Sequence, residues 1–123
     1  MPHSSTVLVL STDPLASALL GAAIELAGGR PLFLGEGERP RDALLRLRPA
    51  HVLVDCDDED ACAEAFLGPV LMTGARVTIF GSPRARRDVR DLAERVGVRL
   101  LELPADVADL PSLLEPALDQ SQR

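Results

Sequence analysis

Five short apolar runs recur along this chain at intervals of about twenty to twenty-five residues, and each is followed by a segment with helical periodicity. Runs that are apolar throughout are typical of strands buried on both faces of a parallel sheet. Strict alternation of such strands with helices predicts right-handed crossovers and helices on both sides of the sheet. We therefore predict an α/β fold with three layers, built on a doubly wound parallel sheet of five strands in the order 2-1-3-4-5. The predicted strands are 7–10, 31–34, 51–55, 77–80 and 98–103.

The segments between these runs carry signals for the start and end of helices. Asp13 suits an N-cap and Pro14 a first helical position, and Gly28 and Gly29 end the first helix. We expect Gly68-Pro69 to break or kink the third helix, and the acidic residues 57–60 to lie at its N-terminus. The apolar face of the first helix is predicted to contain Leu15, Leu19, Ala23 and Ala27. The remaining helices are predicted at 39–48, 61–67, about 89–96 and 107–119, the last interrupted by Pro111 and Pro116.

The composition indicates one globular domain that binds neither nucleic acid nor membrane. The 123 residues are 46% hydrophobic and 26% charged, which suits a single domain over 1–123 with its core at about 6–119. The net charge of −6, with three Phe and no Tyr or Trp, leaves neither a positive field nor stacking platforms for nucleic acid. No apolar run reaches membrane-spanning length and the N-terminus lacks the charge of a secretory signal, so we expect a cytoplasmic protein. Cys56 and Cys62 match no metal or redox spacing and are expected to be reduced, mostly buried thiols.

Candidate site residues directly follow the predicted strands. Parallel strands place their carboxyl ends at one edge of a sheet, where ligands bind in doubly wound folds. His3 and His51 lie in no metal-ligand spacing, so we predict no metal site. The pocket predicted at this edge contains Ser11, Thr12, Asp13, Asp55, Asp57, Ser82 and Leu103.

The strand and helix layout, the opening Val7–Pro14 (VLVLSTDP) and the apolar strand that ends in Asp55 together resemble the receiver domain of two-component response regulators. The resemblance covers essentially the whole chain. It implies the flavodoxin-like fold of this CheY-like family and a role in signal transduction. It also places Asp55 on the aspartate that accepts a phosphoryl group from a histidine kinase.

The chain departs from the receiver pattern at the residues that hold the metal ion and the phosphoryl group. The family's magnesium-binding pair of acids corresponds to Ser11 and Thr12, whose hydroxyls cannot supply the charge that a hard cation needs. The family's hydroxyl residue after the fourth strand corresponds to Gly81, with Ser82 beside it. Its lysine near the end of the fifth strand corresponds to Leu103, and this chain contains no lysine at all.

We therefore predict a degenerate pseudo-receiver that acts as a non-enzymatic protein-interaction module, with no catalytic residues, metal or cofactor. Phosphoryl transfer depends on cations, and without them we expect no magnesium-dependent phosphorylation. One alternative is a phosphoacceptor response regulator that uses Asp55, with Asp13 and Asp57 holding a weakly bound cation. Another is a small-molecule-binding flavodoxin-like domain, supported by fold analogy alone. The expected partner is a histidine kinase or a regulatory protein, and a homodimer stays open.

A basic cluster at the start of the fourth helix is the predicted partner-binding surface. Cations there oppose the helix dipole, which indicates a use such as contact with an acidic partner. The simpler interpretation is a solvated polar face, because surface charges are common and contribute little to stability. The cluster consists of Arg84, Arg86, Arg87 and Arg90.

Overall fold

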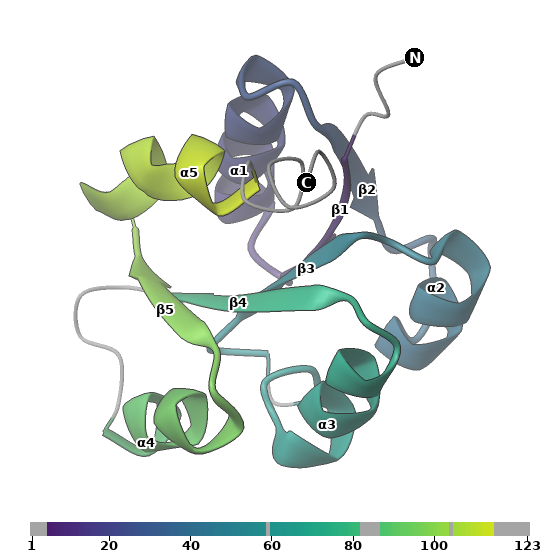
Figure 1. The fold of residues 1–123 in the computed structure, drawn as a ribbon. Coiled ribbons are helices and arrows are strands. Elements are labelled where there is room, and N and C mark those ends of the chain that lie inside the picture. The colour runs from purple at the N-terminus through teal and green to yellow at the C-terminus, as the bar shows by residue number, and fades with distance from the viewer. Residues whose placement is uncertain (1–4, 59, 82–86, 104, 115–123) are drawn as a thin grey trace, which may run out of the picture.

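The computed structural model describes residues 5–58, 60–81, 87–103 and 105–114. Five parallel strands form one sheet in the order β2-β1-β3-β4-β5 (Figure 1), which confirms the predicted fold class and strand order. The strands are β1 (Thr6–Leu10), β2 (Arg30–Phe33), β3 (His51–Asp55), β4 (Arg76–Gly81) and β5 (Arg99–Glu102).

Helices cover both faces of the sheet. Figure 1 shows α1 and α5 on one side of the strands and α2, α3 and α4 on the other. None of the helices in the described part of the chain is long and apolar enough to cross a membrane. The helices are α1 (Pro14–Leu26), α2 (Pro40–Leu47), α3 (Glu64–Met72), α4 (Arg87–Val96), the 3₁₀ helix η1 (Ala105–Asp109) and α5 (Leu110–Leu114).

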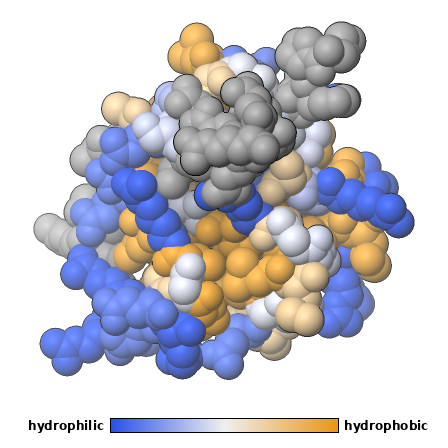
Figure 2. Space-filling view, in the orientation of Figure 1, coloured by the Kyte–Doolittle hydropathy of each residue, from blue (hydrophilic) through white to orange (hydrophobic). Residues whose placement is uncertain are grey.

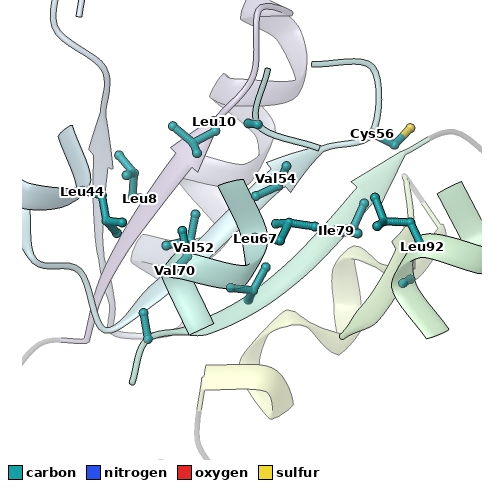
Figure 3. Packing of buried hydrophobic residues seen from close by; sticks show 14 of the residues in the cluster. Leu8, Leu10, Leu44, Val52, Val54, Cys56, Leu67, Val70, Ile79 and Leu92 are labelled. Carbon is teal, nitrogen blue, oxygen red and sulfur yellow. The ribbon is translucent and has the colours of Figure 1, made fainter. Parts of the chain in front are cut away.

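The alternation of side chains along the buried strands creates two hydrophobic cores, one on each face of the sheet. Successive strand residues point to opposite faces, so Leu8 and Val54 join one core while Val7 and Leu53 join the other. Figure 3 shows the first core, in which strand side chains meet Leu67 and other helix residues. Because both faces are covered, the central strands need apolar residues at most positions, as the sequence pattern indicates.

Helix α1 begins as predicted, but it buries a different face. The Asp13 carboxylate accepts a hydrogen bond from the backbone N–H of Leu15 at 3.0 Å, and Pro14 is the first helical residue. The core side of the helix is formed by Leu20 and Ile24, with Ala16, Ala23 and Ala27 packed beside them. Leu15 and Leu19, predicted to be buried, are 78% and 40% exposed. The prediction for these two leucines was therefore wrong, because α1 is apolar on nearly every side and periodicity alone cannot select the buried face.

Helix α3 also differs from its predicted range. It begins at Glu64 and runs through Gly68 and Pro69 to Met72, so of the predicted break or kink, the break was wrong. Pro69 is exposed, while Leu67 and Val70 anchor the helix in the core. The acidic residues precede the helix instead of starting it. Asp58 holds a turn there by accepting hydrogen bonds from the backbone N–H groups of Asp60 and Ala61.

The last predicted helix is divided in two. A 3₁₀ turn over Ala105–Asp109 leads into α5, and Pro111 lies in the first turn of α5, where its missing N–H is tolerated. Residues 115–119 of the predicted helix lie outside the described residues.

Candidate functional site

A pocket of about 330 Å³ opens at the carboxyl edge of the sheet, where β1, β3, β4 and β5 end. The helix α1 forms one wall of this pocket, and the ends of β3 and β4 form its floor. Its surface combines carboxylates with aliphatic and aromatic side chains. The residues that line it are Asp13, Leu15, Ala16, Leu19, Asp55, Asp57, Phe80, Gly81 and Leu103.

Asp55 sits at the floor of the pocket with both carboxylate oxygens engaged. Its side chain is 7% exposed. Oδ2 accepts a hydrogen bond of 2.6 Å from the Ser11 hydroxyl, and Oδ1 accepts one of 2.9 Å from the backbone N–H of Asp57. The Ser11 oxygen in turn accepts the backbone N–H of Asp13 at 3.0 Å. This chain of hydrogen bonds holds the Asp55 carboxylate to the two loops beside it.

Four of the pocket residues proposed from the sequence line this cavity, namely Asp13, Asp55, Asp57 and Leu103. Ser11 joins the site through its bond to Asp55. Thr12 is exposed and is not among the lining residues. Ser82 lies outside the described residues.

The structure adds a contact between Cys56 and Gly81 that the sequence interpretation missed. A β-carbon at position 81 would collide with the Sγ atom of Cys56, so the thiol fills the space that a side chain at 81 would need. The Cys56 thiol also lies 3.9 Å from a carboxylate oxygen of Asp57, to which it donates a weak hydrogen bond. The register pairs Asp55 with Phe80, which places Cys56 beside Gly81. The sequence feature that could have indicated this contact is a glycine at the end of a buried strand, because glycine in a strand often marks a place where another group packs closely against the backbone.

The donor atoms around Asp55 do not fit the magnesium ion that the receiver resemblance implies. Ligand atoms of Asp55, Cys56 and Asp57 lie within 4.8 Å of one another. Magnesium demands an octahedral shell of oxygen atoms, whereas one of these three ligands is a thiol and both Asp55 oxygens already accept hydrogen bonds. Asp13 uses a carboxylate oxygen to cap α1. Two carboxylates and a thiol are a poor ligand set for a hard cation.

The predicted arginine surface on α4 is only partly described. Arg87 and Arg90 are exposed on this helix, whereas Arg84 and Arg86 lie outside the described residues. Arg90 forms an ion pair of 3.3 Å with Glu102. Figure 2 shows hydrophilic residues over the α4 region at the lower left, as expected for a solvated or a charged docking face. The partner-binding role of the cluster stays a prediction.

Comparison with known proteins identifies the fold. No protein-family model and no curated protein sequence matches the chain. A response regulator receiver protein from Burkholderia phymatum is similar in structure, with a TM-score of 0.75 and 16% identity over 94% of this chain and 96% of that chain. The signal receiver domain of a modulated diguanylate cyclase from Desulfovibrio desulfuricans G20 has a TM-score of 0.73 and 23% identity, covering 98% of each chain.

A CheY-like response regulator receiver domain protein from Methanospirillum hungatei JF-1 gives a TM-score of 0.73 at 14% identity, again over 98% of each chain. Sequence identities this low establish similarity of fold alone. The chemistry of the site has to be inferred from the residues that this chain places there. The five-stranded sheet order and these neighbours agree. The chain has the fold of response-regulator receiver domains.

Proposed function

We propose that this protein is a signal-transduction module that acts in the cytoplasm by binding a protein partner, and that it does not take up a phosphoryl group with the help of magnesium. The observation that carries this proposal is the state of Asp55. One carboxylate oxygen is held by the Ser11 hydroxyl and the other by a backbone N–H. Attack on a phosphorus atom, or binding of a metal ion, would therefore compete with hydrogen bonds that already hold both oxygens.

The charges around the pocket support the same conclusion. Phosphoryl transfer is accelerated mainly by cations that neutralise charge on the transferred group. Asp13, Asp55 and Asp57 line the pocket, and none of its described lining residues is basic. Leu103 adds an apolar side chain at the end of β5. A phosphoryl dianion in this pocket would meet three carboxylates, with no compensating charge from the described lining residues.

Magnesium and a phosphodonor provide the test of the proposed function. Millimolar Mg²⁺ is expected to leave the Tm unchanged, because a ligand stabilises the folded state only above its dissociation constant. Acetyl phosphate with Mg²⁺ is expected to leave the intact mass unchanged. The double variant Ser11→Asp/Thr12→Asp is the matched control. It adds one carboxylate at position 11, beside Asp55, and a second at the adjoining position 12, so Mg²⁺ should raise its Tm.

A phosphoryl adduct that is lost in Asp55→Asn would establish the phosphoacceptor alternative. A rise in the Tm of the wild type with Mg²⁺ would contradict the expected absence of magnesium binding. The control variant shows that the assay detects magnesium when the carboxylates are present. A wild type that does not bind magnesium can therefore be distinguished from an assay that fails to detect magnesium binding.

The arginine cluster gives a second prediction, about association with an acidic partner. Reversing Arg86 and Arg87 to Glu should slow the association rate about tenfold at low salt, and the effect should shrink as salt screens the charges. The control Arg39→Glu/Arg41→Glu makes the same change in net charge near α2. Partners captured with the wild type would be compared by their association rates with both variants. Equal rates for all three proteins would leave the cluster as solvated surface.

A further inference from the structure

A groove runs between α2 and α3, which are neighbours on the same side of the sheet (Figure 1). It consists of three adjoining hollows of about 410, 220 and 320 Å³, and each hollow shares lining residues with the next. The middle of the groove is apolar, with Leu44 and Leu45 on the α2 side and Phe66 and Pro69 on the α3 side. Leu45 is 67% exposed. The groove therefore offers apolar surface that a further segment of protein can cover.

Arginine side chains lie at both ends of this apolar section. Arg39 and Arg41 line the N-terminal end of the groove, and Arg48 lines the C-terminal end. All three are exposed, and within the described part of the chain none of them forms an ion pair. The carboxylate of Asp60 offsets part of the charge at the first end. The groove is thus a positively charged surface on a chain whose net charge is −6.

The backbone of Arg48 adopts a conformation that glycine usually occupies. Arg48 ends α2 with a φ of 45° and a ψ of 59°, in the left-handed region. Helices that end in this way commonly place glycine there, because a β-carbon strains the backbone. Among the described residues, Arg48 is the one non-glycine residue with a positive φ. The chain keeps an arginine at this end of the groove in spite of that strain, which indicates a use for the side chain.

We propose that the groove between α2 and α3 binds an acidic amphipathic helix of a protein partner. Apolar side chains of that helix cover Leu45 and Phe66, and its carboxylates pair with the arginines at the two ends. Arg41 and Arg48 are seven residues apart, which is about 10 Å along α2. That distance suits acidic residues at i and i+7 of the partner, with apolar residues at i+3 and i+4 between them. This inference rests on the proposed partner-binding function and names the surface and the chemistry of the partner.

The spacing of charges argues against a second copy of this chain as the occupant. Helix α1 exposes leucine side chains and would be the segment of a second copy that fits an apolar groove. Its acidic residues are Asp13 at the N-cap and Glu25 near the C-terminus. They are separated by about 18 Å, whereas Arg41 and Arg48 are about 10 Å apart. A second copy would therefore leave the arginines at one end of the groove unpaired.

The experiment measures binding of a fluorescent synthetic helix of about 18 residues, with leucine along one face and glutamate beside it, to the full chain. We expect a micromolar Kd by fluorescence anisotropy at low salt. Leu45→Ser should weaken binding about fivefold to tenfold, because apolar contact area is lost. The matched control Leu26→Ser removes an exposed leucine from α1 and should bind like the wild type.

A second set of variants tests the charge contacts. Arg41→Gln should weaken binding about threefold to tenfold at low salt, and the effect should shrink as salt is added. Arg30→Gln makes the same change in net charge at the exposed start of β2 and should leave the Kd unchanged. Arg48→Gly should weaken binding by a similar factor and retain the Tm, because glycine suits the left-handed backbone there. Thermal unfolding of each variant verifies that the fold is retained.

The charge-reversal variants of the arginine test separate this groove from the cluster at the start of α4. Association of a captured partner that docks in the groove is slowed by Arg39→Glu/Arg41→Glu and unchanged by Arg86→Glu/Arg87→Glu. The opposite result for every captured partner would place the docking surface on α4 and overturn the groove proposal.

Three results with the peptide would also overturn the proposal. They are equal binding of a scrambled peptide of the same composition, wild-type affinity in both Arg41→Gln and Arg48→Gly, and self-association of the chain that Leu45→Ser abolishes. The peptide assay contains no magnesium and no phosphodonor. Its failure would leave the test of phosphorylation untouched, and phosphorylation of Asp55 would leave a peptide-binding result standing.

Discussion

Acidification from neutral pH to about pH 4 is expected to lower the free energy of unfolding by about 3 kcal/mol through His51 alone. His51 begins β3, is 4% exposed, and its Nε2 atom lies 2.9 Å from the Thr78 hydroxyl oxygen. Burial, assisted by the positive charge of Arg76 on the neighbouring strand, lowers the pKa of His51 from 6.5 to about 4. The folded protein therefore keeps this imidazole neutral until the solution is strongly acidic.

The direction of the effect follows from proton binding in the two states. Between the unfolded pKa of 6.5 and the folded pKa of about 4, the unfolded chain binds a proton at His51 that the folded chain does not. Protons therefore favour unfolding throughout this range. The stabilisation is complete above pH 6.5, declines as the pH falls, and is lost once the pH is below the folded value of about 4.

Urea titrations at several pH values measure this effect when the wild type is compared with His51→Gln. Glutamine does not titrate, so the free energy of unfolding of the variant should depend less on pH in that range. His3→Gln removes the other histidine of the chain and serves as the matched control, with the slope of the wild type expected. The same slope in wild type and His51→Gln would show that His51 is protonated equally in both states.

The fold could be predicted because the central strands β1, β3 and β4 are mostly apolar on both faces. In a sheet with one face in water, half of the side chains in a run such as Val7–Leu10 would be exposed to solvent. Five such runs separated by helices are compatible with only a few sheet topologies. Helix faces were harder to assign. On α1, Leu15 is no less apolar than Leu20, and only tertiary packing decides that Leu20 is buried. At α3, the exposure of Pro69 decides that the helix continues, and no local pattern reports exposure.

The site was predictable to the extent that it depends on strand ends. Parallel strands bring Ser11, Asp55 and Leu103 to one edge, and their proximity follows from the fold class. The direction of the hydrogen bond from Ser11 to Asp55 depends on rotamers that the sequence does not specify. The contact of Cys56 with Gly81 depends on the register of β3 against β4, which has to be known to one residue.

Adding one methyl group at position 81 is expected to lower the free energy of unfolding by about 2 kcal/mol, because the core beside Cys56 has no room for it. A β-carbon placed on Gly81 would collide with Cys56 Sγ and would lie 3.3 Å from the Cys56 β-carbon. Cys56 is 4% exposed and directly follows a buried strand, so the new methyl group has to shift either the thiol among its packed neighbours or the adjoining backbone. Gly81→Ala should therefore displace the Cys56 side chain or the backbone next to Asp55.

A double-mutant cycle separates this collision from a general loss of stability. Cys56→Ala alone leaves a small cavity and should cost about 1 kcal/mol. In Cys56→Ala/Gly81→Ala the new methyl group occupies the space of the missing sulfur, so the double variant should be more stable than Gly81→Ala. Gly68→Ala is the control, because nothing lies within 4 Å of a β-carbon at that helical position. It should gain about 0.5–1 kcal/mol from helix propensity. Additive free energies in the cycle, measured by urea unfolding, would show that Cys56 and Gly81 do not share this space.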